Sequence, residues 1–237
     1  MPNVEKIALI TGASSGIGAA LSRNLCEKGY RCILAARSSD KLEKLAQSLR
    51  NDGFNCSVVI VDVSSESSVD ALFEASAKIG HVSLVINNAG LGIFSKIEES
   101  SVDDWDAQIN VNLRGAFLVS RKFIPSMQSQ KSGILVFMNS VAGNFGYPYS
   151  AAYVASKFGL RGLSDSLRNE LRKDSIKVIS VHPGAIDTSF WDDINVDFPR
   201  EEMLAPEAIA SSVVHAIDAP DATVIENLTI RRVGGDF

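Results

Sequence analysis

A glycine-rich turn near the start of the sequence constrains the fold of this chain more than any other feature. It follows residues 7–10, a short and continuously apolar run that is typical of a strand buried on both faces of a parallel sheet. A helical stretch comes next, at about 17–28, and Gly29 stops it. The glycines within 11–18 allow a tight turn and a close approach of the backbone to a pyrophosphate. The order of strand, glycine turn and helix therefore predicts the first half of a nucleotide-binding unit.

Strands and helices alternate over the rest of the chain. Strands are expected at 31–36, 57–61, 82–86, 134–138, 178–181 and 223–230, and helices at 40–51, 66–79, 102–128, 150–173 and 206–217. This alternation predicts an α/β protein with a single-domain Rossmann-type fold, a doubly wound parallel sheet of about seven strands with helices on both faces. The one domain spans 1–237, and an irregular segment at about 189–205 is expected to form a mobile substrate lid.

Composition excludes several classes of function. The net charge of −5 and the pI near 5.3 argue against nucleic-acid binding and against an anionic membrane surface. No apolar run approaches the roughly 18 residues of a transmembrane helix, and the first residues lack the pattern of a signal peptide. We therefore expect a cytoplasmic protein with neither a membrane nor a nucleic acid as partner.

The cysteines and histidines do not form a recognisable site in the sequence. Three cysteines stand at 26, 32 and 56 without a C-x-x-C spacing, which predicts free thiols rather than disulfides or a zinc site. The histidines at 81, 182 and 215 are scattered, and we interpret each as structural. No metal site is expected.

The end of the second predicted strand indicates which nicotinamide cofactor is used. A carboxylate about 20 residues after the glycine turn would bind the ribose 2′-hydroxyl of NAD. Here the strand ends in Ala36 and Arg37, so no acid is available and a guanidinium could pair with a 2′-phosphate. This predicts NADP(H) over NAD(H), although a solvent-facing arginine at a strand end is the alternative.

Tyr153 and Lys157 form a candidate proton-transfer pair. They are four residues apart in a helical stretch that opens with Ser150, a residue type favoured at N-caps, so they share one face of the helix. A lysine cation at that distance is expected to lower the tyrosine pKa from about 10 towards neutrality. Taken alone, the pair is more typical of two surface residues on an amphipathic helix.

Several motifs, in order, resemble the short-chain dehydrogenase/reductase family over about residues 5–188. The matching motifs are Thr11-Gly12-x-x-x-Gly16-x-Gly18, Asn87-Asn88-Ala89-Gly90, Asn112, Ser140, Tyr153 with Lys157, and Pro183-Gly184 with Thr188. The cofactor contacts that this resemblance implies are Gly12, Ser14, Ser15, Gly16, Ile17, Gly18, Arg37, Asp62, Val63, Asn88, Ala89, Gly90, Tyr153, Lys157, Pro183, Gly184, Ile186 and Thr188. The last 40 or so residues vary within the family.

The resemblance implies a hydride transfer between NADP(H) and a carbonyl or secondary alcohol. Tyr153 would protonate the developing alkoxide, and Ser140 would donate a hydrogen bond to the substrate oxygen. Lys157 would lower the tyrosine pKa and hold the nicotinamide ribose. Asn112 would anchor a water chain that resupplies the proton through Lys157.

The substrate and the assembly are less constrained. The C-terminal residues 229–237 resemble those of relatives that act on small hydroxy acids or ketones, so we expect a ketone, aldehyde or hydroxy-acid substrate. A 3-oxoacyl-(acyl-carrier-protein) reductase is the first alternative, and a non-catalytic NADP(H)-binding sensor or scaffold is the second. The apolar excess of 102–128, together with Ala155, Gly159 and Gly162 on the next helix, predicts a homodimer or homotetramer. Reaction direction and stereochemistry stay open.

Overall fold

The computed structural model describes residues 5–192 and 199–235 and contains one parallel sheet. Within these residues the sheet has seven strands in the order β3-β2-β1-β4-β5-β6-β7, with every pair parallel. The strands are β1 (Ile7–Thr11), β2 (Arg31–Ala36), β3 (Cys56–Ile60), β4 (Val82–Asn87), β5 (Gly133–Met138), β6 (Ile176–Pro183) and β7 (Asn227–Ile230). The predicted fold class is confirmed.

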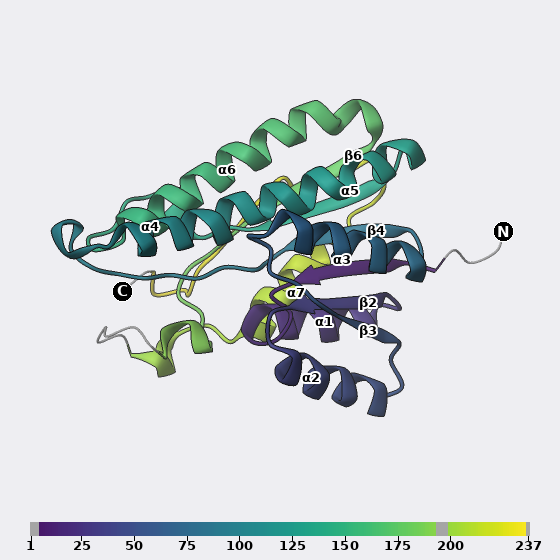
Figure 1. Cartoon of the computed structure of the whole chain (residues 1–237), viewed down its shortest axis with the longest axis horizontal. Coiled ribbons are helices and arrows are strands. Elements are labelled where there is room, and N and C mark those ends of the chain that lie inside the picture. The colour runs from purple at the N-terminus through teal and green to yellow at the C-terminus, as the bar shows by residue number, and fades with distance from the viewer. Residues whose placement is uncertain (1–4, 193–198, 236–237) are drawn as a thin grey trace.

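Two layers of helices cover the two faces of this sheet (Figure 1). One face packs against α1, α2 and α7, and the other against α3, α5 and α6, each through its own hydrophobic cluster. The helices are α1 (Gly16–Glu27), α2 (Ser39–Asn51), α3 (Glu66–Ile79), α4 (Val102–Gln108), α5 (Ala116–Gln130), α6 (Ala151–Leu171) and α7 (Pro206–Ile217). The central strands are therefore buried on both sides, which explains why they read as continuous apolar runs.

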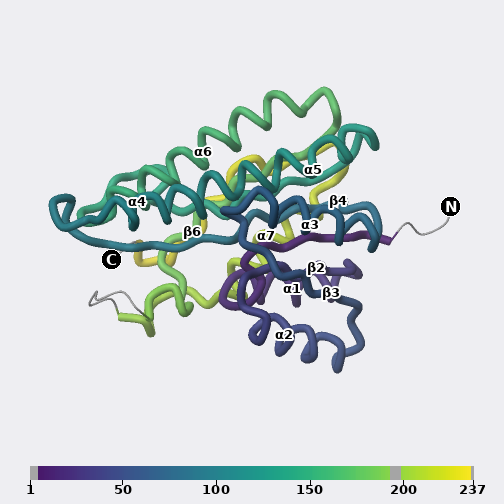
Figure 2. Tube along the Cα trace, in the orientation of Figure 1, coloured from purple at the N-terminus to yellow at the C-terminus, as the bar shows by residue number. Residues whose placement is uncertain are grey.

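The strand order reverses between β1 and β4. From β1 the chain moves outward to β2 and β3, then returns to place β4 on the other side of β1. In doubly wound sheets, ligands bind in the crevice at the carboxyl ends of the strands at such a reversal. Figure 2 traces the long connection from β4 to α4 and the chain after β6 to the same end of the molecule, where α4 and α6 begin.

The predicted helix over 102–128 is interrupted. A π-helical segment, η2 (Ile109–Gly115), separates α4 from α5. Segments of this kind are often found at functional sites, because they turn one side chain out of the regular helical register. The apolar periodicity of the sequence does not reveal the interruption.

Other expectations about the chain have mixed outcomes. The last strand is shorter than the predicted 223–230, because residues 223–226 form no ladder with β6. All three cysteines are buried free thiols, as predicted. In the described part of the chain, no helix has the length and apolarity needed to cross a membrane, and no cluster of histidine, cysteine or acidic side chains could hold a metal ion.

Candidate active site

The glycine turn after β1 forms a cradle that larger residues would fill. Gly12 adopts φ 64°, and a Cβ atom there would lie 2.8 Å from the Cα of Ala89. At Gly18 a Cβ would lie 2.2 Å from the carbonyl oxygen of Gly12. Glycine is therefore required at both positions, by conformation at the first and by space at the second. The backbone of the turn is therefore open to a ligand at the N-terminus of α1.

The first turn of α1 has donors to offer a ligand. Ser15 occupies the N-cap position, but its side chain makes no capping hydrogen bond. The first N–H groups of a helix have no partner within the helix, and here no side chain satisfies them. Together with the helix dipole they form a site for an anion such as a pyrophosphate. The residues present in this cradle therefore fit a dinucleotide.

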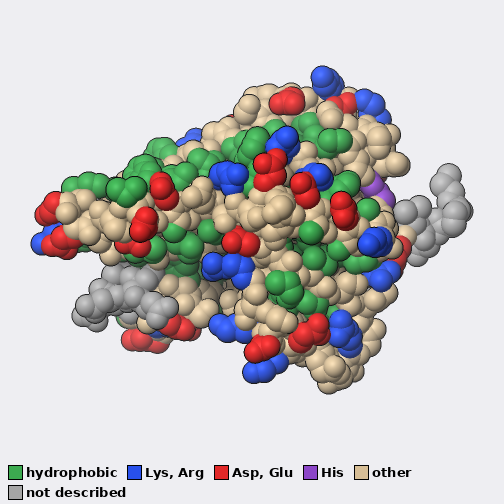
Figure 3. Space-filling view, viewed as in Figure 1, with side chains coloured by type: hydrophobic (Ala, Val, Ile, Leu, Met, Phe, Trp, Pro, Cys, Tyr) green, Lys and Arg blue, Asp and Glu red, His purple; other side chains and the backbone are tan. Residues whose placement is uncertain are grey.

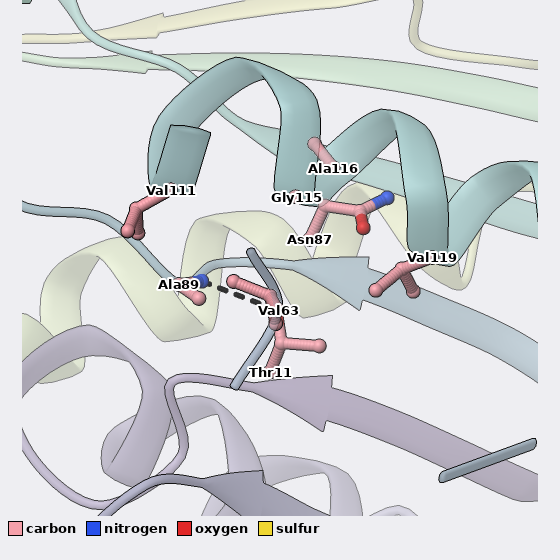
Figure 4. A pocket seen from close by; sticks show the side chains of 8 residues that line it. All are labelled: Thr11, Val63, Asn87, Ala89, Val111, Gly115, Ala116 and Val119. Atoms are coloured by element: carbon pink, nitrogen blue, oxygen red, sulfur yellow. Dashed lines mark hydrogen bonds between the residues drawn. The ribbon is translucent and has the colours of Figure 1, made fainter. Parts of the chain in front are cut away.

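A hydrogen-bonded latch joins β1 to β4 beside the cradle. The Thr11 hydroxyl accepts from the backbone N–H groups of Asn88 (3.0 Å) and Ala89 (3.1 Å), and the Asn88 amide donates to the carbonyls of Thr11 and Gly12. Figure 4 shows the Thr11–Ala89 bond at the edge of a narrow hollow that is also lined by Val63 and Asn87. This hollow leaves no room for a water molecule. The hollow is therefore too small to be a ligand pocket.

The second and third strands end in the charged residues that the sequence singled out. Arg37 is exposed and makes no hydrogen bond or ion pair with the described residues. The Asp62 carboxylate accepts from the backbone N–H (2.9 Å) and the hydroxyl (2.7 Å) of Ser64. These bonds, with a smaller contribution from the charge of Arg37, lower the pKa of Asp62. Arg37 is therefore available to an external anion, while Asp62 is committed to its own turn.

The loop after β6 closes the other side of the cradle. A Cβ atom at Gly16, which has φ 52°, would lie 2.9 Å from Cγ2 of Thr188. Gly184 donates from its backbone N–H to the carbonyl of Ile230, and Ile186 pairs with Leu204 in an isolated bridge. The predicted nicotinamide-side loop, which begins with Pro183, therefore adjoins the glycine turn, as its motif implies.

Tyr153, Ser140 and Lys157 lie together next to this cradle. The Lys157 ammonium is buried, donates to the carbonyl of Met138 (2.9 Å) and lies 5.6 Å from the centre of the Tyr153 ring. A hydrogen bond links the Tyr153 phenol to the Ser140 side chain. A Cβ atom at Gly90 would lie 3.8 Å from Nζ of Lys157, so the lysine also faces the chain after β4.

The expected direction of the Tyr153 pKa shift is wrong for this structure. Burial of the phenol raises the pKa of Tyr153 to about 12, and the hydrogen bond with Ser140 offsets only part of that rise. Burial also lowers the pKa of Lys157 to about 8. Desolvation disfavours the charged form of both groups and is the largest cause of both shifts. At neutral pH, Tyr153 holds its proton and Lys157 is mostly charged.

Hydrogen bonds to its neighbours hold the side chain of Asn112 in place. Its amide nitrogen donates to the carbonyl of Leu91 (2.9 Å) and to the Ser156 hydroxyl (3.0 Å), and its oxygen accepts from the Leu91 N–H (2.8 Å). Ser156 in turn donates to the carbonyl of Tyr153 (2.7 Å). Asn112 thus ties the chain after β4 to the helix that carries Tyr153, and both N–H groups of its amide are used in these bonds.

His182 was interpreted from the sequence as structural, and only its partner, the Ser140 loop, was missed. Its Nδ1 lies 3.1 Å from the Ser140 carbonyl, and its Nε2 lies 3.0 Å from the Ser180 hydroxyl. A carbonyl can only accept, so Nδ1 carries the proton and Nε2 accepts from Ser180. Burial lowers the pKa of His182, which favours this neutral form.

A second missed feature is a cluster of aromatic rings around Tyr153. The Phe94 and Phe190 rings lie 5.5 Å and 5.8 Å from the Tyr153 ring, centre to centre. Trp191 stacks on Phe94 at 6.3 Å and meets Phe190 edge-on at 5.2 Å. We call Phe94, Phe190 and Trp191 the aromatic cluster. The sequence indicated aromatic residues in the predicted lid, but it gave no sign that Phe94 joins them. Residues 193–198 of that lid lie outside the described residues.

Ser150 differs from its expected role in a smaller way. It stands at the N-cap position of α6, but its hydroxyl donates to the carbonyls of Tyr147 (2.8 Å) and Pro148 (2.9 Å) and does not cap the helix. The preceding Tyr149 has φ 61°, a left-handed conformation that is uncommon for a residue with a side chain. A tight turn, rather than a side-chain cap, therefore sets the start of the Tyr153 helix.

The solved structures that resemble this one include proteins with bound nicotinamide cofactors. An alcohol dehydrogenase from the archaeon Thermococcus sibiricus, complexed with 5-hydroxy-NADP, is 33% identical with a TM-score of 0.89, and 97% of each chain is covered. A metagenomic short-chain oxidoreductase in complex with NADP is 32% identical with a TM-score of 0.85, and the match covers 96% of this chain and 97% of that one.

Sequence comparison leads to the same group of proteins. An uncharacterized oxidoreductase of Staphylococcus epidermidis is 34% identical over 230 residues, which is 97% of this chain and 98% of the relative. One from Staphylococcus aureus strain MRSA252 is 36% identical with the same coverage. The family model described as short chain dehydrogenase matches residues 6–198. With most of its length matched by that model, this chain belongs to the short-chain dehydrogenase family of oxidoreductases.

Proposed function

We propose that this protein is an NADP(H)-dependent oxidoreductase that interconverts the carbonyl and the secondary alcohol of a small substrate. The observation that carries the proposal is the meeting of Tyr153, Ser140 and Lys157 beside an open glycine cradle. When bound, NADPH supplies a hydride to the carbonyl carbon. The products are the alcohol and NADP⁺, with one proton taken up.

Tyr153 gives its phenolic proton to the carbonyl oxygen as the hydride arrives. Its pKa of about 12 keeps it protonated at neutral pH, as a general acid requires. Ser140 donates a hydrogen bond to the same oxygen, and His182 holds the Ser140 backbone in place. Lys157 binds the nicotinamide ribose and is positioned to return a proton to Tyr153. Asn112 anchors the water chain that resupplies the proton through Lys157.

The cofactor is held along the carboxyl edge of the sheet. The uncapped N-terminus of α1 binds the pyrophosphate, and Arg37 pairs with the 2′-phosphate. Asp62, Val63 and Asn88 to Gly90 would complete the contacts with the cofactor. The bound cofactors of the similar alcohol dehydrogenase and metagenomic oxidoreductase support NADP(H) as the choice.

A turnover screen tests this proposal. NADPH oxidation is followed with ketones, aldehydes, 2-oxo acids and 3-oxoacyl thioesters, and Tyr153→Phe is the control for each substrate. We expect turnover with at least one simple carbonyl compound, and we expect it to disappear in the variant. Turnover of only the thioester would favour the carrier-protein reductase instead. Tight NADPH binding with no Tyr153-dependent turnover of any substrate would support the non-catalytic sensor.

A further inference from the structure

The aromatic cluster lies over the residue that is proposed to act on the substrate. It comes from two separate parts of the chain, because Phe94 follows β4, whereas Phe190 and Trp191 form η5 (Ser189–Trp191) after β6. All three side chains are half-buried. Two of the rings contact Tyr153 directly, so the surroundings of the phenol on this side are aromatic.

Local contacts hold these rings in place. The Trp191 indole N–H donates to the carbonyl of Ile186 (2.9 Å), and the backbone N–H of Phe190 donates to the Thr188 hydroxyl (3.3 Å). A Cβ atom at Gly92 would lie 2.4 Å from Cζ of Phe190 and 2.9 Å from Cε2 of Phe94. Only glycine at this position lets the two rings approach the backbone so closely. The cluster is therefore an ordered surface with a fixed orientation, suited to flat apolar groups.

The cations near the cluster are already engaged. Lys157 is buried, and its ammonium donates to the carbonyl of Met138 and serves the nicotinamide ribose in the proposed function. The Arg200 guanidinium is bound by the carboxylates of Asp187 (2.5 Å) and Asp192 (2.6 Å). A substrate carboxylate placed against these rings would lose its hydration without gaining a cation, which is strongly unfavourable.

We infer that the substrate is an uncharged carbonyl compound that carries a flat apolar group, such as an aryl ketone, which packs against Phe94 and Trp191. This inference rests on the proposed function and narrows it, because it removes the hydroxy acids from the expected substrates. The carbonyl oxygen then faces Tyr153 and Ser140. The flat group packs on the exposed parts of the half-buried Phe94 and Trp191 rings.

Matched carbonyl compounds test the inference by steady-state kinetics with NADPH. Acetophenone has the flat ring, cyclohexyl methyl ketone has similar bulk without aromaticity, phenylglyoxylate adds a carboxylate, and acetone lacks the ring. We expect kcat/KM for acetophenone to exceed that for phenylglyoxylate by at least about tenfold, which corresponds to 1.4 kcal/mol. Cyclohexyl methyl ketone should lie between acetophenone and acetone.

Variants of the cluster separate recognition from chemistry. Trp191→Ala and Phe94→Ala should each lower the acetophenone-to-acetone ratio of kcat/KM by about five- to tenfold, and Trp191→Phe should retain most of it. Phe54→Ala is the matched control, because Phe54 is an equally half-buried ring that packs on the opposite, α1–α2 face of the sheet. That variant should leave the ratio unchanged.

Failure of this inference is distinguishable from failure of the proposed function. Tyr153-dependent turnover that is as fast with phenylglyoxylate as with acetophenone would overturn the substrate class and leave the function intact. If no carbonyl compound is turned over, binding is read from fluorescence in Trp105→Phe, which leaves Trp191 as the only tryptophan of the two in the chain. Quenching of Trp191 by acetophenone but not by phenylglyoxylate, in the presence of NADP⁺, would still support the aromatic site. Absence of quenching, or equal quenching by both, would overturn it.

Discussion

Burial shifts the pKa values of Tyr153 and Lys157 in opposite directions, and these shifts have a measurable effect on the pH dependence of activity. The Lys157 pKa lies at about 8, so the ammonium loses its proton as the pH rises through that value, while Tyr153 stays protonated to about 12. We expect kcat/KM for NADPH, which reports groups of the free enzyme, to be constant below pH 8 and to fall by up to tenfold per unit above it. The alkaline limb then belongs to Lys157 and not to the proton donor.

Lys157→Arg provides the control for that pH profile. An arginine keeps its charge over the whole range, so its profile should stay flat above pH 8 even if its overall activity is lower. A wild-type profile that is flat to pH 10 would contradict the buried, easily deprotonated lysine.

Arg37 carries the second prediction at the scale of single residues. A charge-assisted bond to a 2′-phosphate contributes roughly 1.5–3 kcal/mol, which is about 10- to 150-fold in affinity. NADPH should therefore exceed NADH in kcat/KM by one to two orders of magnitude, and Arg37→Ala should erase most of the difference by weakening NADPH alone. Ala36→Asp should reverse the preference, because the new carboxylate repels the phosphate and accepts from the 2′-hydroxyl. A wild-type preference for NADH would make Arg37 only a surface cation.

At the scale of elements, the π-helical segment places Asn112 between two parts of the site. Asn112→Ala would leave both the N–H and the carbonyl of Leu91 without their partner, at a cost of up to about 1–3 kcal/mol for each of these half-buried groups. We expect the free energy of unfolding to fall by about 2–5 kcal/mol in denaturant titrations, and kcat to fall as well. Asn112→Asp keeps the acceptor and should be milder. An unchanged stability in Asn112→Ala would show that Leu91 is held by other contacts.

How far the sequence could predict these elements depends on the kind of signal each one carries. The bounds of β2, α3 and α7 agree with the sequence-based ranges, because apolar periodicity and Pro206 at the start of α7 are local signals. The π segment at 109–115 has no local signal, since it arises where the helix must fit both the sheet and α6. The Tyr153 pKa could not be read from spacing either, because desolvation depends on rings brought in from distant segments.

The residues of the candidate site also divide into those with a local signal in the sequence and those without one. Arg37 and the glycine turn were accessible from the sequence, because their position in a strand–turn–helix unit fixes what they can touch. His182 and Phe94 were not, because each acts through a partner far away along the chain. Gly159 was expected to leave room for another subunit. A Cβ atom there would instead lie 2.7 Å from Leu113 of the same chain, so its small size has an internal reason.

At the scale of the whole molecule, an apolar surface runs over α4 to α6. Figure 3 shows hydrophobic side chains gathered there. Trp105, Phe117 and Phe158, which lie on α4, α5 and α6, have 39%, 44% and 45% of their surfaces exposed. Exposed apolar patches of this kind favour association. The double variant Phe117→Glu with Phe158→Glu should sediment as a 25.4 kDa monomer, whereas the wild type should sediment as a dimer or tetramer.

Val233→Glu controls for the added charge in that experiment. Val233 is fully exposed, and it lies outside the α4–α6 surface, near the end of the chain. The control variant should keep the wild-type sedimentation. A wild type that remains a 25.4 kDa species at micromolar concentration would remove this surface as a subunit interface.

Tyr153→Phe tests the central claim most directly, because it removes one oxygen atom and keeps the ring that contacts Phe94 and Phe190. The measurement is kcat for NADPH-dependent carbonyl reduction, set beside the dissociation constant for NADPH from a binding titration. We predict that kcat falls by about 100- to 10,000-fold, the usual contribution of a general acid, while the dissociation constant changes by less than about threefold. A variant that keeps more than a few per cent of the wild-type kcat would contradict the assignment of Tyr153 as the proton donor.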